Sequence, residues 1–226
     1  MQERTAAKTV RERHKENSQM SRPVDTSQAG FPGESLVKQR KQQRNGSLPA
    51  DLSPERRTVV KNACSLVGKV GYYWGGKSLV IGWDSRWGQL RKVTAAGSPT
   101  TGTYRPYGLD CSGMVDWAFY NASGGQYIIG HGGGTSAQHS YCTDLSWDEA
   151  QPGDLVFYPG NEHVGIVGGW DENGDLLIIH CASGYNNVVI MGLEGFTAIA
   201  RPNNNGRASA ASGLRALGSL YIAERI

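Results

Sequence analysis

Long hydrophobic runs are missing from this chain of 226 residues. No apolar stretch reaches the roughly 18 to 20 residues that a membrane-spanning helix needs, and the N-terminus lacks the apolar segment of a signal peptide. We therefore expect no membrane span, and as written the chain carries no export signal. It could still be the excised end of a longer secreted or membrane-anchored protein.

Closely spaced cysteine pairs are missing as well. The four cysteines are Cys64, Cys111, Cys142 and Cys181. They form no C-x-x-C pair and show none of the spacing that is typical of a disulfide framework. We expect all four to be free thiols.

The third absence is a basic surface on the folded part. Residues 1–50 hold ten Lys and Arg and five Asp and Glu residues, whereas residues 51–226 hold thirteen and fifteen. The excess positive charge therefore belongs to the N-terminal segment, whose only aromatic residue is Phe31. Without aromatic platforms this segment does not indicate nucleic-acid binding. We predict that residues 1–50 are a disordered basic tail or linker.

The segment after Leu109 predicts a helix with a cysteine in its first turn. Asp110 is a good N-cap, and apolar residues recur behind it at helical spacing. Cys111 then lies at the positive end of the helix dipole, which stabilises a thiolate over a thiol. A small buried cysteine packed under a helix is the commoner alternative, and Cys111 alone does not decide between the two.

Two further patterns set the fold class. Ser53, Pro54 and Glu55 are typical of a helix start, and an apolar stripe follows at helical spacing. Beyond Gly153 the chain changes to short Val- and Ile-rich runs, which predict an antiparallel meander. These runs cover residues 154–158, 163–170, 175–182, 188–193 and 198–201. The fold class is therefore α+β, with the helices first and the sheet second.

This pattern predicts one domain over residues 53–202. Residues 203–226 follow as a linker and a short C-terminal segment, because residues 203–212 are rich in Asn, Gly, Ser and Ala. Within the domain, residues 126–150 contain no clear periodicity, and we expect them to be irregular.

Two histidines fall on neighbouring strands of the predicted sheet. If Asp171–Gly174 is a four-residue turn, the numbers of opposed residues add up to 345, so His180 lies opposite Gly165. His163 is two residues from Gly165 and therefore lies on the same side, about 7 to 8 Å from His180 at Cα. A thiolate nucleophile needs a histidine base oriented by a third polar group. The alternative is that each is a hydrogen-bonded structural histidine.

A zinc site is a weaker interpretation of the same region. His139 and Cys142 have the spacing of half a site. Strand alternation, however, sends Cys181 to the face opposite His180, so these two cannot both complete a tetrahedral site. We expect no metal.

Several segments together resemble the NlpC-type family of bacterial cell-wall cysteine endopeptidases. In chain order they are Tyr72-Tyr73-Trp74-Gly75-Gly76, Asp110-Cys111-Ser112-Gly113, Gln151-Pro152-Gly153-Asp154-Leu155-Val156-Phe157, His163-Val164-Gly165-Ile166-Val167 and Ile179-His180. The combination is far more specific than any one segment. The resemblance implies a papain-like α+β fold, in which the nucleophile lies at a helix N-terminus packed on a C-terminal antiparallel sheet.

The same resemblance implies an activity, the hydrolysis of peptidoglycan stem peptides, typically between D-glutamate and the diamino acid. Cys111 would be the nucleophile that forms a thioester acyl-enzyme. His163 would be the general base and then the acid, and His180 would orient it. No cofactor is implied.

Three more residues match family positions that contact substrate. Tyr72 matches the tyrosine that helps stabilise the oxyanion, and Asp110 and Ser112 match positions that help hold the stem peptide. The 33 residues between Gly76 and Asp110 are more than is usual in the family. They include Trp83 and Trp87, which we consider as part of a lid or substrate groove, the alternative being a surface excursion packed on itself.

Two other functions stay open. A catalytically silent module would bind wall peptide through the same groove, although the presence of all three Cys and His positions counts against it. An amidase or acyltransferase would use the same thiol, because an acyl-enzyme serves any nucleophile that resolves it. We expect a monomer that acts on peptidoglycan stem peptides, outside the cell or in the cell wall. A larger conjugation or phage-associated protein is one context for such a domain.

Overall fold

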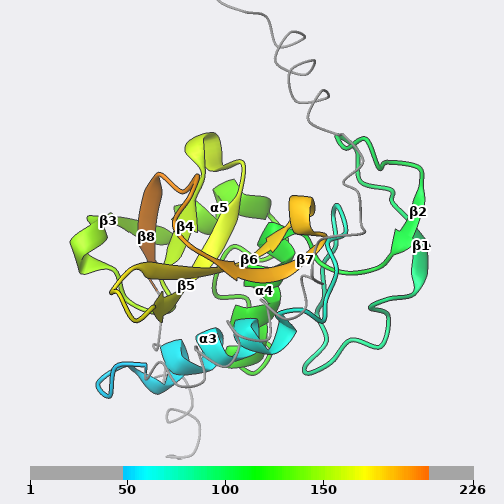
Figure 1. Cartoon of the computed structure of the whole chain (residues 1–226). Helices are drawn as coiled ribbons and strands as arrows, with labels where there is room; N and C mark the ends of the chain where they lie inside the picture. The colour runs from blue at the N-terminus through cyan, green and yellow to red at the C-terminus, as the bar shows by residue number, and fades with distance from the viewer. Residues whose placement is uncertain (1–47, 204–226) are drawn as a thin grey trace, which may run out of the picture. The chain divides into compact units, whose positions relative to one another are not determined.

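The computed structural model describes residues 48–203. The expectations for residues 1–47 and 204–226 lie outside this range. Within it, helices come first and an antiparallel sheet second, so the predicted α+β class is confirmed (Figure 1). None of the described helices combines the length and the apolar character that crossing a bilayer would require.

Helix α3, Pro54–Leu66, begins where the sequence predicts. The Ser53 hydroxyl accepts the N–H of Arg56 at 3.3 Å, and Pro54 takes the first helical position, where its missing N–H costs nothing. The chain leaves the helix at Gly68, whose φ of +71° suits glycine. The buried stripe faces α4 and the sheet and consists of Val59, Val60, Ala63 and Leu66.

Helix α4, Cys111–Ala122, is the central element of the domain. Every residue from Ser112 to Phe119 is buried, since α3 packs on one side and strands β5 and β6 pack on another. A helix that is enclosed in this way is fixed by packing over most of its length. Its first turn is therefore a rigid place for a functional side chain.

The main sheet has six strands in the order β3-β8-β4-β5-β6-β7, all antiparallel. The strands are β3 (Cys142–Leu145), β4 (Leu155–Phe157), β5 (Val164–Trp170), β6 (Leu176–Ala182), β7 (Asn187–Met191) and β8 (Ala198–Pro202). The predicted meander is confirmed for β4 to β7. The last strand instead crosses back to pair with β4, and β3 then adds an edge strand that the sequence did not predict.

Each face of the sheet carries its own apolar cluster. The larger one joins α3 and α4 to the sheet and includes Cys181. The smaller one lies on the opposite face and consists of Val156, Val167, Ile178, Phe196 and Ile199. Since strand residues alternate between the two faces, His180 lies on the face opposite Cys181, as predicted.

A buried ion-pair cluster ties α3 to the sheet. Asp154 is fully buried and meets Arg56 at 2.5 Å and Arg201 at 2.9 Å. Its carboxylate also accepts the N–H of Gln151 at 2.9 Å. The Gln-Pro-Gly-Asp segment is therefore a structural joint, since two guanidinium groups and a backbone N–H satisfy the buried charge.

The 33-residue stretch before α4 projects from the domain and carries its own hairpin, β1 (Leu90–Lys92) and β2 (Tyr104–Pro106). Figure 1 shows this hairpin at the right of the view, with β3 and β8 at the left. The base of the stretch is closed by a parallel bridge between Tyr72 and Leu109. The stretch was considered either as a lid or substrate groove or as a surface excursion. Its conformation is that of a surface excursion with its own secondary structure.

Residues 126–150 are more regular than expected. They form helix α5 (Gly134–Ser140), strand β3 and the 3₁₀ turn η1 (Trp147–Glu149), so the expectation of irregular chain was wrong. The helix gives no apolar periodicity because its one buried side chain is polar, that of Gln138. Short 3₁₀ turns η2 (Pro159–Asn161) and η3 (Ser183–Tyr185) complete the domain.

Candidate active site

The candidate nucleophile lies in the first turn of α4. Asp110 is the N-cap, as predicted, and its Oδ1 accepts the N–H of Gly113 at 2.6 Å and the hydroxyl of Ser112 at 3.0 Å. Cys111 is the first helical residue and is half-buried beside the N–H groups that a helix start leaves unpaired. The helix start therefore brings Asp110, Cys111 and Ser112 together.

Interlocking glycines hold the Tyr-Trp-Gly-Gly segment against this helix start. A Cβ atom at Gly76 would overlap the carbonyl of Gly108, and a Cβ atom at Gly113 would overlap the carbonyl of Gly76. The same Gly76 carbonyl accepts the N–H of Asp110 at 3.2 Å. Backbones can approach this closely only where the side chain is hydrogen.

The two predicted histidines meet on the sheet. His163 immediately precedes β5, His180 lies on β6, and the Nε2 of His163 is 2.7 Å from the Nδ1 of His180. The rings are 5.0 Å apart at an angle of 72°, and the ring of Phe196 contacts both. The predicted placement of both histidines on one face is confirmed.

A β-bulge produces this register. The turn between β5 and β6 has five residues, 171–175, rather than the predicted four, so Trp170 pairs with Leu176, one residue out of the predicted register. A bulge after Val167 absorbs the extra residue, and Val167 then pairs with Ile178 as predicted. The predicted length of the turn was therefore wrong, whereas the predicted register of the residues beside the histidines was right.

The thiol lies beside the beginning of β5. The backbone N–H groups of Ser112 and of Val164, the residue after His163, act to lower the pKa of the Cys111 thiol. The charge of Asp110 raises the pKa of the His163 ring, although this effect is smaller than that of burial, which lowers it. In the described part of the chain, no hydrogen bond joins the thiol to this ring. Catalytic hydrogen bonds often form only once substrate is bound.

The pKa values describe a pair that is neutral at pH 7. Burial, and next the charge of Asp110, raise the pKa of Cys111 to about 11. Burial lowers the pKa of both His163 and His180 to about 4. This corrects the expectation that the helix terminus gives Cys111 a low pKa. The thiol is therefore protonated at pH 7.

The contact between the rings fixes which nitrogen of His163 is free. Only Nδ1 of His163 is available to accept a proton, because Nε2 is bonded to His180. A neutral His163 that accepts at Nδ1 carries its hydrogen on Nε2 and donates it to the Nδ1 of His180. His180 then carries its own hydrogen on Nε2, which is buried without a partner among the described residues. If His163 accepts a proton at Nδ1, His180 is therefore the acceptor that selects its tautomer.

Tyr72 lies next to the thiol. Burial raises the pKa of its hydroxyl, and the charges of Cys111, Asp110 and Cys181 raise it further. The phenol therefore stays protonated, and no hydrogen bond within residues 48–203 occupies it. A protonated hydroxyl without a partner can donate to an oxygen that becomes negative.

Lys77 is a site residue that the sequence analysis missed. Its Nζ lies 2.6 Å from Asp110 Oδ1 and 2.5 Å from Ser112 Oγ. Its carbonyl accepts the hydroxyl of Tyr107 at 2.5 Å, and its charge lowers the pKa of Cys111. The one feature of the sequence that could have indicated Lys77 was its position directly after Gly75 and Gly76.

Gln138 is a second missed residue, because it lies in the segment expected to be irregular. It is fully buried, and its Nε2 donates to the carbonyl of Ser112 at 2.8 Å and to Asp116 Oδ1 at 2.7 Å. These two hydrogen bonds from α5 hold the first turn of α4 in place. Burial raises the pKa of Asp116, which also accepts the N–H of Gly132.

The two tryptophans of the long stretch have different environments. Trp87 is buried against Trp117 of α4, with ring centres 5.5 Å apart, and belongs to the core. This corrects the expectation that it lines a groove. Trp83 is 56% exposed and meets Trp87 edge-on, so of the two only Trp83 offers a surface.

His139 and Cys142, which were considered as half of a zinc site, make other contacts. The two ring nitrogens of His139 bond to Asn161 and Asp144, and the Cys142 thiol donates to the carbonyl of Gln138. In the described range, no group of three His, Cys, Asp or Glu side chains could hold a metal ion. Cys111, Cys142 and Cys181 are thiols outside any disulfide, as predicted.

Comparison with known proteins connects this geometry to a family. A sequence model of the NlpC/P60 family matches residues 69–190, which is more than half of the chain. Probable endopeptidase p60 of Listeria grayi is 38% identical over 78 residues, which are 32% of this chain and 14% of that protein. The match therefore spans a small part of that relative.

Two solved structures from Mycobacterium tuberculosis are also similar. The peptidoglycan hydrolase RipB is 24% identical with a TM-score of 0.46, and the match covers 80% of this chain and 90% of RipB. RipD, described as a non-catalytic NlpC/p60 domain protein adapted to peptidoglycan binding, is 19% identical with a TM-score of 0.46. Its match covers 66% of this chain and 98% of RipD.

Proposed function

The chain belongs to the NlpC/P60 family, and from this we propose that it is a cysteine endopeptidase that cuts peptidoglycan stem peptides, between D-glutamate and the diamino acid. The observation that supports the proposal is the position of Cys111 at the start of α4, where its thiol meets the backbone N–H of Val164, the residue after His163, which is itself hydrogen-bonded to His180. A cell-wall location and a monomeric state are part of the same proposal.

The chemistry begins with a neutral thiol. As the sulfur of Cys111 attacks the carbonyl carbon, its proton passes to Nδ1 of His163, and the imidazolium is oriented by His180. The oxyanion forms at the helix start, where the N–H of Cys111 and the hydroxyl of Tyr72 can donate to it.

The intermediate then collapses to a thioester. His163 gives the proton to the amine of the diamino acid, which leaves as the C–N bond breaks. A water molecule, deprotonated by His163, attacks the thioester. The C–S bond breaks, D-glutamate leaves with a free carboxyl group, and the sulfur of Cys111 takes the proton back from His163. Asp110, Ser112 and Lys77 surround this point and would contact the stem peptide.

Digestion of defined muropeptides tests the proposal. Reduced wild type and Cys111→Ala are incubated with muropeptides that contain or lack diaminopimelate, and the products are identified by mass spectrometry. We expect cleavage after D-glutamate by the wild type alone. Products extended by an added amine, rather than hydrolysed, would indicate acyl transfer.

A silent binding module is the second candidate, favoured by one observation. The buried thiol is neutral and unbonded to His163 in the described structure. Binding of muropeptide by both proteins, without cleavage by either, would establish this candidate. Cleavage by both would show that Cys111 is not the nucleophile.

A further inference from the structure

The β1–β2 hairpin carries three cations that we call the basic arm: Arg91, Lys92 and Arg105. Every residue of both strands is exposed, and Arg91 lies directly opposite Arg105 in the register. Like charges opposed across a hairpin destabilise it. Within residues 48–203 none of the three makes an ion pair. The hairpin therefore carries an uncompensated positive charge that a bound anion would neutralise.

The charge of the arm contrasts with that of the part of the domain that follows it in the chain. From residue 85 to 105 the chain has four Lys and Arg and no acidic residue, whereas from 106 to 200 it has eleven acidic residues and no Lys or Arg. A neighbouring cation, Arg86, is already engaged by Asp84 at 2.5 Å. The free cations of this part of the domain are thus concentrated on the arm.

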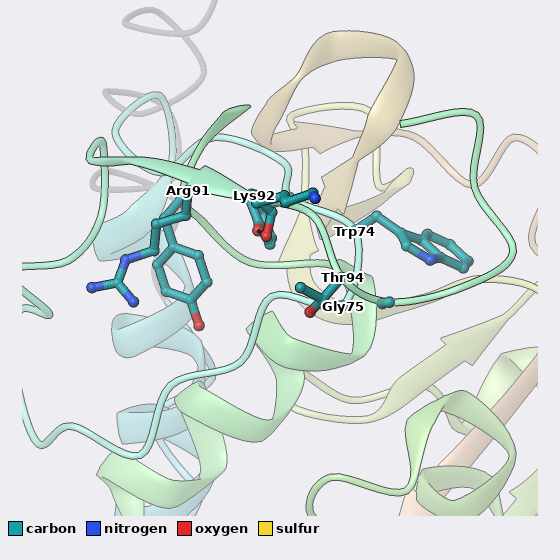
Figure 2. A pocket seen from close by; sticks show the side chains of 8 residues that line it. Trp74, Gly75, Arg91, Lys92 and Thr94 are labelled. Carbon is teal, nitrogen blue, oxygen red and sulfur yellow. Dashed lines mark hydrogen bonds between the residues drawn. The ribbon is translucent and has the colours of Figure 1, made fainter. Parts of the chain in front are cut away.

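A pocket of about 450 Å³ opens beside the arm, within the usual size range of ligand sites. It is lined by Tyr73, Trp74, Gly75, Arg91, Lys92, Thr94, Ala95 and Tyr107. Figure 2 shows Lys92 extending toward Trp74 across the pocket, with Arg91 at its other end. The guanidinium of Arg91 lies 5.4 Å from the centre of the Tyr107 ring. The pocket therefore combines aromatic walls with two cations.

The pocket connects to the nucleophile through short contacts. The Tyr107 hydroxyl donates to the carbonyl of Lys77, whose ammonium meets Asp110 beside the nucleophile. On the other wall, Tyr73 is adjacent in the chain to Tyr72. The pocket and the nucleophile are therefore linked through Tyr107 and Lys77 on one wall and through Tyr73 and Tyr72 on the other.

We propose that the basic arm and this pocket form a second substrate subsite, which binds a free carboxylate of the peptidoglycan stem peptide away from the scissile bond. This inference rests on the proposed function. Planar guanidinium groups pair with carboxylates in bidentate geometry, and the aromatic walls suit the apolar part of a peptide. A long phosphate polymer fits less well, because beyond the arm it would meet the acidic part of the domain.

Binding is measured separately from turnover, in the Cys111→Ala background. Two fluorescent muropeptides that differ only in whether the stem carboxylates are free or amidated are titrated by anisotropy. The arm variant is Arg91→Gln with Arg105→Gln. The matched control is Lys61→Gln with Lys69→Gln, which removes two exposed cations from the region of α3. Thermal unfolding checks that both variants are folded.

We expect the arm variant to bind the free-carboxylate muropeptide about 10-fold more weakly, and the amidated one with unchanged affinity. The control should bind both as the parent does. Equal losses on both muropeptides, or no loss on either, would overturn the inference. Tighter, arm-dependent binding of synthetic poly(glycerol phosphate) would also overturn it, because the arm would then serve a phosphate polymer.

The two proposals fail in different ways. If the reduced wild type cleaves neither muropeptide but binding still depends on the carboxylate and the arm, the endopeptidase fails and the subsite stands. If the wild type cleaves both, and the two arm substitutions made in the protein that keeps Cys111 change neither KM, the endopeptidase stands and the subsite fails.

Discussion

Alkylation of Cys111 should be slow at neutral pH, because its thiol is buried. The pKa of the thiol is raised from 9.0 to about 11. Only the thiolate reacts, so about 100-fold less of the reactive form is present at pH 7 than for an unperturbed cysteine. The rate should rise about tenfold per pH unit until pH approaches 11.

Burial and the helix dipole oppose each other at this site, and their magnitudes decide the outcome. The helix N-terminus favours a thiolate by about 0.3 to 1 kcal/mol. A rise of two pKa units corresponds to about 2.7 kcal/mol against the thiolate. Burial therefore wins in the free protein, and a substrate-driven proton transfer to His163 must supply the difference.

Mass-mapped iodoacetamide labelling between pH 6 and 10 measures this rate on Cys111 alone. Asp110→Asn removes the second cause of the raised pKa while keeping a good N-cap. It also frees Lys77 to favour the thiolate, so labelling should become faster. Glu55→Gln on α3 removes a remote carboxylate and should leave the rate unchanged.

A labelling rate that is already constant between pH 6 and 8 would refute this reasoning. Such a plateau would mean that Cys111 and His163 form a thiolate–imidazolium pair in the free protein. Among the other thiols, Cys142 with a pKa of about 12 and Cys181 with a still higher one should be labelled after Cys111.

Four further outcomes follow from the contacts. His180→Asn, which can still accept a hydrogen bond, should retain more cleavage activity than His180→Ala, which should lose about 100-fold or more in kcat; equal losses would show that the acceptor is not what matters. Tyr72→Phe should lower kcat about 100-fold with little change in KM, and unchanged kcat would remove it from the oxyanion site. Asp154→Ala leaves the buried Arg56 uncompensated and should lower the free energy of unfolding by about 3 kcal/mol in urea titrations; a loss below about 1 kcal/mol would contradict the buried pair. Because the folded-state pKa of His163 is about 4 against 6.5 unfolded, stability should fall as pH drops from 6.5 to 4, and a melting temperature that stays flat across this window would exclude a buried neutral imidazole.

Local rules were sufficient for the parts of the fold with strong signals. Ser53 and Asp110 cap their helices as predicted, because a side-chain acceptor before an apolar stripe is an unambiguous start. The pairing of His163 with His180 followed from strand alternation, and it holds because the bulge after Val167 restores the register that the five-residue turn had shifted by one residue.

The rest depends on contacts distant in sequence. Helix α5 is held through the buried amide of Gln138, which no apolar pattern reveals. Lys77 joins the site because glycine backbones approach each other from both sides of the long stretch. The raised pKa of Cys111 depends on how deeply the thiol is buried, which sequence does not give.

Because the base of the long stretch is closed, the length of the stretch can change without altering the rest of the domain. The residues that flank the stretch meet, because the N–H of Asp110 donates to the carbonyl of Gly76, and Trp87 anchors its middle in the core. Once the ends of a loop are fixed, doubling its length costs only about 0.6 kcal/mol of closure entropy. The tip between β1 and β2 can therefore gain or lose residues at little thermodynamic cost. Substrate range can diverge there without disturbing Cys111.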